Sequence, residues 1–207
     1  MHDYSIDRHP KEVVLFILAF IAISSAPALN RWIADLVDYL DAATGWKSGP
    51  VTAIPVFGLF TAIYYLFNTR LWKLSWPRRL LLVPDLNGTW QCEGLTVLRR
   101  GIEESTPWSG EITITQSWSK MLIHLRTAQS ASHSVSASLA HEPGIGYRLL
   151  YHYRNDPNAE NLELQKHDGA AEMLFSQDCQ TGTGNYFTDQ HRRTIGTMKI
   201  KKVEHGD

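Results

Sequence analysis

The residues best suited to bind a ligand lie in two segments of the C-terminal part, where aromatic, hydroxyl and cationic side chains occur close together. In residues 147–154, alternation places the tyrosines on one face of a predicted strand and the arginines on the other. Residues 184–196 bring an aromatic ring, a hydroxyl and two arginines together. Aromatic rings stack on nucleobases, and guanidinium groups bind phosphate through two parallel hydrogen bonds. The candidate ligand-binding residues are Tyr151, Tyr153, Tyr186, Thr188, Arg192 and Arg193.

The same residues also have a purely structural interpretation. Tyr151 and Tyr153 could pack in the core of a β domain while the arginines of that strand face water. Residues 191–193 could be the solvated tip of a hairpin. Sequence alone leaves both interpretations open.

No catalytic or metal-binding pattern accompanies these residues. The chain has neither an HExxH pair nor a Cys/His doublet, and it has no GxSxG elbow. Two Gly-x-Gly fragments, at 144–146 and 182–184, lack the Lys-Ser/Thr that follows a phosphate-binding loop, so we assign them to turns and strand bends. The sequence therefore predicts a protein that is not an enzyme, with no catalytic residues, metal site or cofactor.

The elements that must position the candidate residues are strands. From residue 84 onward, short alternating segments are separated by Gly, Pro, Asn and Ser, which is typical of an antiparallel all-β domain. Tight connections and one buried face favour closure of the sheet, so we expect a small eight-stranded β-barrel, with a sandwich as the second choice. Eight or nine strands are expected from nine candidate segments: 89–98, 111–118, 121–127, 132–141, 147–154, 162–166, 170–177, 184–188 and 194–203.

Two apolar segments precede this domain. Residues 13–29 and 51–67 are runs of 17 residues without a charge, and about 20 helical residues cross the hydrocarbon core of a bilayer. We therefore expect two transmembrane α-helices in a hairpin that occupies residues 1–83, with a basic flank, followed by a ligand-binding domain in residues 84–207. Residues 32–40 have an amphipathic helical pattern and could either extend the first helix or lie on the membrane surface.

The charged residues beside the apolar runs predict the orientation in the membrane. Arg70, Lys73, Arg78 and Arg79 follow the second run with no acidic residue before Asp85. Basic flanks remain on the cytoplasmic side, so we expect a multi-pass membrane protein with its C-terminal domain in the cytoplasm. If the first run were instead a cleaved signal segment, the second run would still leave that domain in the cytoplasm.

The charge of the predicted β domain argues against binding to DNA or RNA. Residues 84–207 contain 12 Lys and Arg against 15 Asp and Glu, a formal net charge of -3. Nucleic-acid binding requires a basic surface to neutralise the phosphate backbone. An anionic ligand must therefore be recognised by a few side chains within a pocket.

The order of these parts resembles a known family. Two spanning helices and a basic flank are followed by Pro84-Asp85-Leu86-Asn87-Gly88-Thr89-Trp90, which opens the β-rich domain, and by Gly184-x-Tyr186-Phe187-Thr188 near its end. This resembles the SMODS-associated two-transmembrane β-strand-rich effectors of bacterial CBASS antiphage systems. The resemblance spans nearly the whole chain, and its strongest element is the architecture.

The resemblance implies both a ligand and a mechanism. A cyclic dinucleotide made by a partner CD-NTase would bind the cytosolic barrel and drive homo-oligomerisation, and the helices would then disrupt the lipid bilayer and kill the infected cell. It implies that Tyr186, Thr188, Arg192 and Arg193 lie at the ligand, with Tyr151 and Tyr153 on the adjoining wall. This chain departs from expectation in having no basic surplus to neutralise two phosphates.

Two other functions fit the same architecture. One is a membrane-tethered barrel of lipocalin type that binds an apolar ligand, since such barrels begin with a Gly-x-Trp similar to residues 88–90. The other is a membrane scaffold or interaction protein that binds a partner through an edge strand. The polarity of the pocket distinguishes the first of these from a nucleotide receptor.

Overall fold

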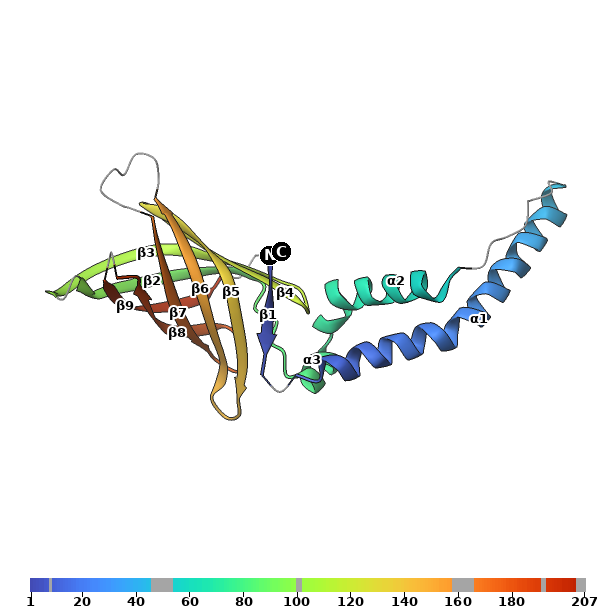
Figure 1. Ribbon diagram of the computed structural model, residues 1–207, viewed down its shortest axis with the longest axis horizontal. Coiled ribbons are helices and arrows are strands. Elements are labelled where there is room, and N and C mark those ends of the chain that lie inside the picture. Colours follow the sequence, from blue (N-terminus) through green and yellow to red (C-terminus); the bar gives the residue numbers. More distant parts are fainter. Residues whose placement is uncertain (8, 46–53, 100–101, 158–165, 191–192, 204–207) are drawn as a thin grey trace. The chain divides into compact units, whose positions relative to one another are not determined.

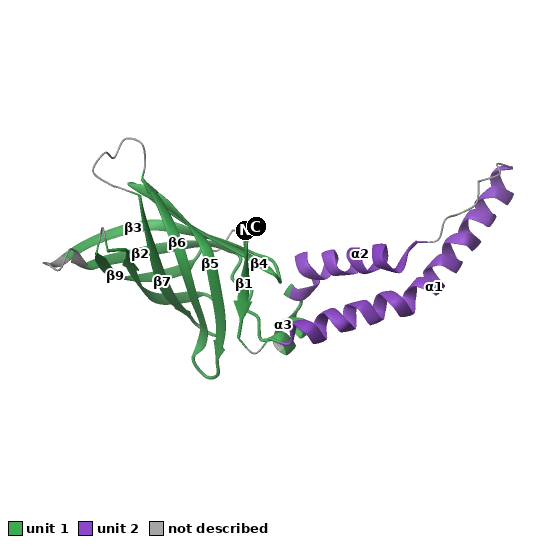
Figure 2. Cartoon of the chain, viewed as in Figure 1, with its two compact units in different colours: residues 1–9, 73–207 green, residues 10–72 purple. Residues whose placement is uncertain are grey.

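The computed structural model describes residues 1–207 except 8, 46–53, 100–101, 158–165, 191–192 and 204–207. The chain divides into two compact units, coloured separately in Figure 2. Residues 10–72 form a helical unit. Residues 1–9 and 73–207 form a β-rich unit, which also contains the short helix α3 (Ser75–Leu81).

The helical unit consists of α1 (Lys11–Thr44) and α2 (Val56–Thr69), followed by a short 3-10 turn, η1 (Leu71–Lys73), at its border. The 34-residue α1 is long and apolar enough to cross a membrane, which confirms a candidate span in the first run. Helix α2 is apolar but has only 14 described residues. Helix α1 continues through Pro27 as far as Thr44, so residues 32–40 extend the first helix.

The two helices are joined by packing and by one side-chain clamp. Asn30 Nδ2 donates to the Ile54 carbonyl at 3.2 Å, and Asn30 Oδ1 accepts the Ile54 N–H at 2.8 Å. This pairing satisfies the backbone N–H and C=O of Ile54 just before α2 begins. An unsatisfied backbone group costs the most free energy where no water is present. The buried stripe of α1 repeats every four residues: Val14, Leu18, Ala22 and Ala26.

The β unit is a closed barrel in which β2 to β9 pair in chain order and β9 returns to β2 (Figure 1). The predicted antiparallel all-β domain is therefore confirmed. Among the described residues, inward and outward positions alternate along the strands except at two register shifts, between Thr96 and Leu98 of the first barrel strand and between Ser134 and Ser136. The strands are β2 (Gly88–Arg99), β3 (Ile102–Gln116), β4 (Lys120–Thr127), β5 (Ser130–Glu142), β6 (Gly146–Pro157), β7 (His167–Phe175), β8 (Thr181–Thr188) and β9 (Thr194–Lys202).

One strand of the sheet was not predicted. Strand β1 (His2–Ile6) lies between β4 and β5, antiparallel to the former and parallel to the latter. The β domain thus includes residues from the extreme N-terminus in addition to the predicted range 84–207. The predicted strand 162–166 falls outside the described residues except for Lys166, which is not in a strand.

Side chains fill one half of the barrel, at the end where β3 turns into β4. Trp90 is fully buried there, its ring centroid lies 5.1 Å from that of Phe175, and its indole N–H donates to the Leu86 carbonyl at 3.1 Å. Cys92 is the next inward residue on β2 and is also fully buried, and burial raises the pKa of its thiol to about 12. This filled half supports the open half as a rigid base.

A buried glutamine ties three parts of the chain together at this base. Gln116 Oε1 accepts the Leu86 N–H at 2.9 Å, and its Nε2 donates to the Pro84 carbonyl and to the Tyr4 hydroxyl, both at 3.1 Å. Gln116 is 4% exposed. Burial raises the pKa of Tyr4 to about 12, so its hydroxyl remains protonated. Gln116 therefore joins β1, β3 and the segment that enters β2.

Candidate ligand-binding site

The barrel contains a cavity of about 420 Å³ in the half opposite the filled base. Side chains from all eight strands β2 to β9 line it, so it lies inside the barrel and opens at the end where β4 turns into β5. Ligand pockets in proteins span about 300–1,000 Å³, so this cavity can hold part or all of a small ligand.

Three glycines create space for aromatic rings in the wall. Gly94 pairs with Trp108, Gly169 with Tyr153 and Gly196 with Tyr186, each directly across two neighbouring strands. In each pair the ring lies over the glycine, and a Cβ atom added to the glycine would overlap the ring. The absence of a side chain therefore lets each ring lie against the sheet, which keeps the cavity open.

Tyr186 is the centre of a small polar network in this wall. Its hydroxyl accepts the Trp108 indole N–H at 3.0 Å and bonds with Thr96 Oγ1 at 2.9 Å. The rings of Tyr186 and Trp108 meet edge to face, with centroids 5.7 Å apart. These contacts hold the Trp108 ring of β3 and the Tyr186 ring of β8 in fixed orientations, with Thr96 of β2 as the third partner.

A second pair of aromatic rings lies on β6. Tyr151 and Tyr153 both line the cavity, and their ring centroids are 6.1 Å apart. Burial, the largest effect, raises the pKa of Tyr151 well above its usual range. Its hydroxyl is therefore a neutral hydrogen-bond donor at physiological pH.

Most of the remaining lining residues are polar and uncharged. Among the described lining residues there is no Lys or Arg, and His167 is the single basic side chain. Asn155 and Thr194 are more than nine-tenths buried, and Asn155 Oδ1 and Thr194 Oγ1 have no hydrogen-bond partner within the described part of the chain. The Ser and Thr residues of the lining are Thr96, Thr106, Ser109, Thr127, Ser130, Ser132, Thr188 and Thr194.

The structure brings four of the six predicted site residues together. Tyr151, Tyr153, Tyr186 and Thr188 line the same cavity, and Thr188 Oγ1 also accepts the Thr194 N–H at 2.8 Å. Arg193 does not line it. Its exposed side chain donates from Nε to the Gln190 carbonyl at 3.0 Å, and its backbone is left-handed, with φ 49°.

The sixth predicted site residue, Arg192, lies outside the described residues, so its position relative to the cavity is undescribed. The roles of all six residues remain predictions.

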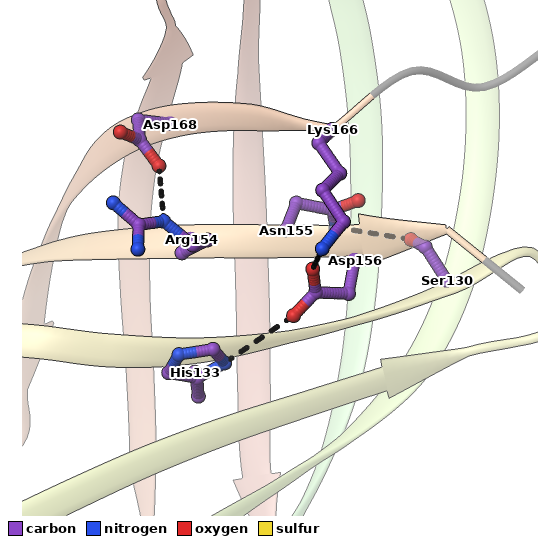
Figure 3. Close-up of polar contacts among 7 residues, drawn as sticks. All are labelled: Ser130, His133, Arg154, Asn155, Asp156, Lys166 and Asp168. Atoms are coloured by element: carbon purple, nitrogen blue, oxygen red, sulfur yellow. Dashed lines mark hydrogen bonds and ion pairs between the residues drawn. The ribbon is translucent and has the colours of Figure 1, made fainter.

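Charged side chains near the mouth form ion pairs on the outer face of the barrel. Figure 3 shows Arg154 with Asp168 at 3.1 Å, and Asp156 between Lys166 at 2.9 Å and His133 at 3.8 Å. The hydrogen bond from Lys166, the largest effect, lowers the pKa of the Asp156 carboxyl. Exposed pairs of this kind contribute little stability.

Asn155 lies between Arg154 and Asp156 on β6, and its side chain points into the barrel. Its Nδ2 donates to Ser130 Oγ at 3.0 Å, inside the wall (Figure 3). The alternation of β6 thus separates a charged outer surface from a neutral interior.

Several lining residues could not be identified from the sequence. Trp108 and Thr96 contact Tyr186 only because β2, β3, β8 and β9 are neighbours in the closed sheet. The available signal is a glycine in or next to three of the predicted strands (Gly94, Gly169 and Gly196), and a strand glycine indicates close approach of another group. That signal does not name the group that approaches.

Comparison with known proteins adds independent information. Residues 81–202 match the family described as Cap15, cyclic dinucleotide receptor domain. The chain is also 36% identical over 195 residues to a protein of Yersinia aleksiciae named CD-NTase-associated protein 15, and the match covers 93% of this chain and 89% of that protein. The matched family segment contains every residue that lines the cavity.

Proposed function

Because the chain belongs to the Cap15 family of CBASS effectors with a cyclic dinucleotide receptor domain, we propose that its barrel binds a cyclic dinucleotide in the cavity. The observation that carries this proposal is the lining itself. It combines three tyrosines and a tryptophan with many hydroxyl groups. Aromatic rings stack with bases of any sequence, and hydroxyl groups hydrogen-bond to base edges and ribose.

The charge distribution indicates how the ligand is oriented. With no Lys or Arg among the described lining residues, the interior offers little to neutralise a phosphate. We infer that a base enters the cavity and the phosphates stay near the mouth, at the end where Arg193 lies in the β8–β9 turn. In this orientation the unpaired polar atoms of Asn155 and Thr194 are available to a base edge.

The polarity of the cavity argues against the lipocalin-like alternative. An apolar ligand would offer no hydrogen-bond partner to Asn155 Oδ1 or Thr194 Oγ1 after water is displaced, which costs free energy at each atom. A nucleotide offers donors and acceptors to the same groups. The lining therefore favours the nucleotide.

The test is the replacement of Tyr186 with alanine in the full-length protein. We expect affinity to fall by about 10-fold to 100-fold, because base stacking on an aromatic ring contributes about 1–3 kcal/mol. Calorimetry in detergent against cyclic dinucleotides of adenine, guanine and uracil measures the loss.

The matched control is Phe187→Ala, since Phe187 is the next residue on β8 and is exposed on the outer face. Equal binding by the two variants would show that the cavity is not the binding site.

We further propose that the helical unit is a multi-pass anchor in the inner membrane, with the barrel in the cytoplasm. Ligand made by a partner CD-NTase would drive self-association, and the crowded helices would disrupt the bilayer without any enzymatic step. A ligand shifts an equilibrium between monomer and assembly only if it binds the assembled form better. Basic residues after α2 and the apolar character of both helices support this arrangement.

Small residues on α2 are available for contact between copies. Ala22 and Ala26 of α1 are buried within the hairpin, whereas Gly58 and Ala62 of α2 are exposed. Small residues at four-residue spacing let the backbones of two membrane helices approach closely. The surface formed by Gly58 and Ala62 is thus the proposed contact between hairpins.

Gly58→Leu is expected to leave ligand binding unchanged and to abolish membrane permeabilisation. A Cβ at this position would only touch the Pro55 ring, at 3.6 Å, so the hairpin itself tolerates a side chain. The leucine would instead separate neighbouring hairpins. Dye release from liposomes measures permeabilisation, and Gly58→Ala, which keeps a small residue, is the control. Full dye release by the leucine variant would contradict this contact.

A further inference from the structure

The barrel has one incomplete join, between β4 and β5. These strands pair directly only from His124–Arg126 to Ala131–His133, and then they separate. Beyond that point β1 fills the gap, with His2 and Asp3 pairing to β4 and residues 4–6 pairing to β5. We call the whole join between β4 and β5 the seam (Figure 1). It has a part in which the two strands pair directly and a part that β1 fills.

Strand β1 is held in the seam by a few specific contacts. His2 Nε2 bonds with Ser134 Oγ at 2.7 Å, and the same Ser134 oxygen accepts the Ile123 N–H at 2.9 Å. Tyr4 reaches Gln116 at the base, and the Asp7 N–H donates to the Leu139 carbonyl at 2.9 Å. A strand of only five residues depends on these contacts to remain paired.

The directly paired part of the seam is also part of the cavity wall. Leu125 and Ser132 pair with each other across β4 and β5, and both line the cavity. Ser134 follows two positions later on the same face of β5 and carries the bond to His2. A ligand that moves Ser132 would therefore also shift Ser134, the residue that anchors β1 through His2.

We propose that β1 is an exchangeable strand, and that in the assembled protein residues 2–6 of a second copy fill the seam. This inference rests on the proposed ligand-driven self-association. An empty seam would expose the unpaired N–H and C=O groups of two strand edges, which only another strand satisfies well. The N-terminal strand of a second copy offers the same side chains in the same register, so exchange costs little once two copies are close.

Chain length gives the exchange a consequence in the membrane. Five residue steps separate Ile6 from Lys11, the first residue of α1, and they span about 17 Å at most. A second copy that supplies its β1 must therefore bring the start of its α1 within that distance of the first barrel. Strand exchange thus connects the barrels and draws the helices of neighbouring copies together.

The test uses two full-length versions that each carry one new cysteine in a Cys179→Ser background. Ser5 and Ser138 are partners in the β1–β5 pairing, and both point outward. Ser5→Cys and Ser138→Cys proteins are reconstituted together in liposomes, exposed to the tightest-binding cyclic dinucleotide of the panel, and oxidised. A disulfide between the two versions requires strand exchange, and we expect a dimer band on a non-reducing gel only with ligand.

The control pair replaces Ser138→Cys with Thr183→Cys, at an exposed position of β8 outside both the seam and the cavity lining, and should give no band. Calorimetry on the same samples reports ligand binding separately. Intact binding without a dimer band overturns strand exchange alone, whereas absent binding overturns the proposed function on which it rests. As a second measurement, oxidised Ser5→Cys/Ser138→Cys in one chain should bind ligand but release no dye until reduced, and dye release while oxidised overturns the proposal.

Discussion

Replacing Gly196 with alanine is expected to reduce affinity for a cyclic dinucleotide by about 100-fold or more, although residue 196 itself offers no side chain to a ligand. The added methyl group would occupy the space of the Tyr186 ring, which lies directly over Gly196. The ring must then turn into the cavity and release its bonds with Trp108 and Thr96. The substitution removes a stacking surface and also fills the space for the base, so its effect exceeds the about 1–3 kcal/mol of stacking alone.

Calorimetry of the full-length protein in detergent measures this effect, and circular dichroism checks that the barrel is folded. Thr197→Ala is the matched control, because Thr197 is the next residue on β9 and points outward. If Gly196→Ala bound the ligand within about threefold of the unmodified protein, the ring over Gly196 could not be part of the binding surface.

Gln116→Met is expected to have the largest effect on stability, lowering the free energy of unfolding by about 3 kcal/mol or more. Methionine has a similar length but cannot pair with the Leu86 N–H, the Pro84 carbonyl or the Tyr4 hydroxyl. Each buried polar group left without a partner costs about 1–3 kcal/mol. For a domain of this size the melting temperature should fall by about 6–12 °C.

The melting temperature of the full-length protein in detergent, followed by tryptophan fluorescence, gives the measurement. Gln91→Met is the control, since Gln91 is exposed on β2 and the substitution is chemically the same. Similar melting temperatures for the two variants would mean that the Gln116 contacts do not stabilise the base of the barrel.

Much of this architecture could be predicted because its signals are local. The change from long apolar runs to alternating segments separates α1 from β2 to β9, and residues 147–154 show their two faces directly in the sequence. This alternation places Tyr151 and Tyr153 on one surface without reference to any strand partner. The tyrosine and threonine of β8 were found in the same way, from residue types concentrated in one short segment.

The features that escaped prediction depend on contacts between distant segments. Strand β1, with the sequence HDYSI, is short and polar, and it becomes a strand only because β4 and β5 separate beside it. The pairs of Gly94 with Trp108 and Gly196 with Tyr186 exist only in the register of the closed sheet. Register is a property of paired strands, so neither sequence segment alone contains it.

The clamp between Asn30 and Ile54 has a consequence for the surrounding lipid. It fixes the start of α2 at the level of Asn30, and α2 then continues for 14 residues, or about 21 Å. A hydrocarbon core is about 30 Å thick, so in the proposed membrane setting the helix α2 is shorter than the core beside it. Lipids beside α2 must then compress or tilt to match its length. This hydrophobic mismatch favours clustering of hairpins through their α2 helices. Each resting hairpin would therefore already deform a small area of membrane, and gathering many of them would add these areas together.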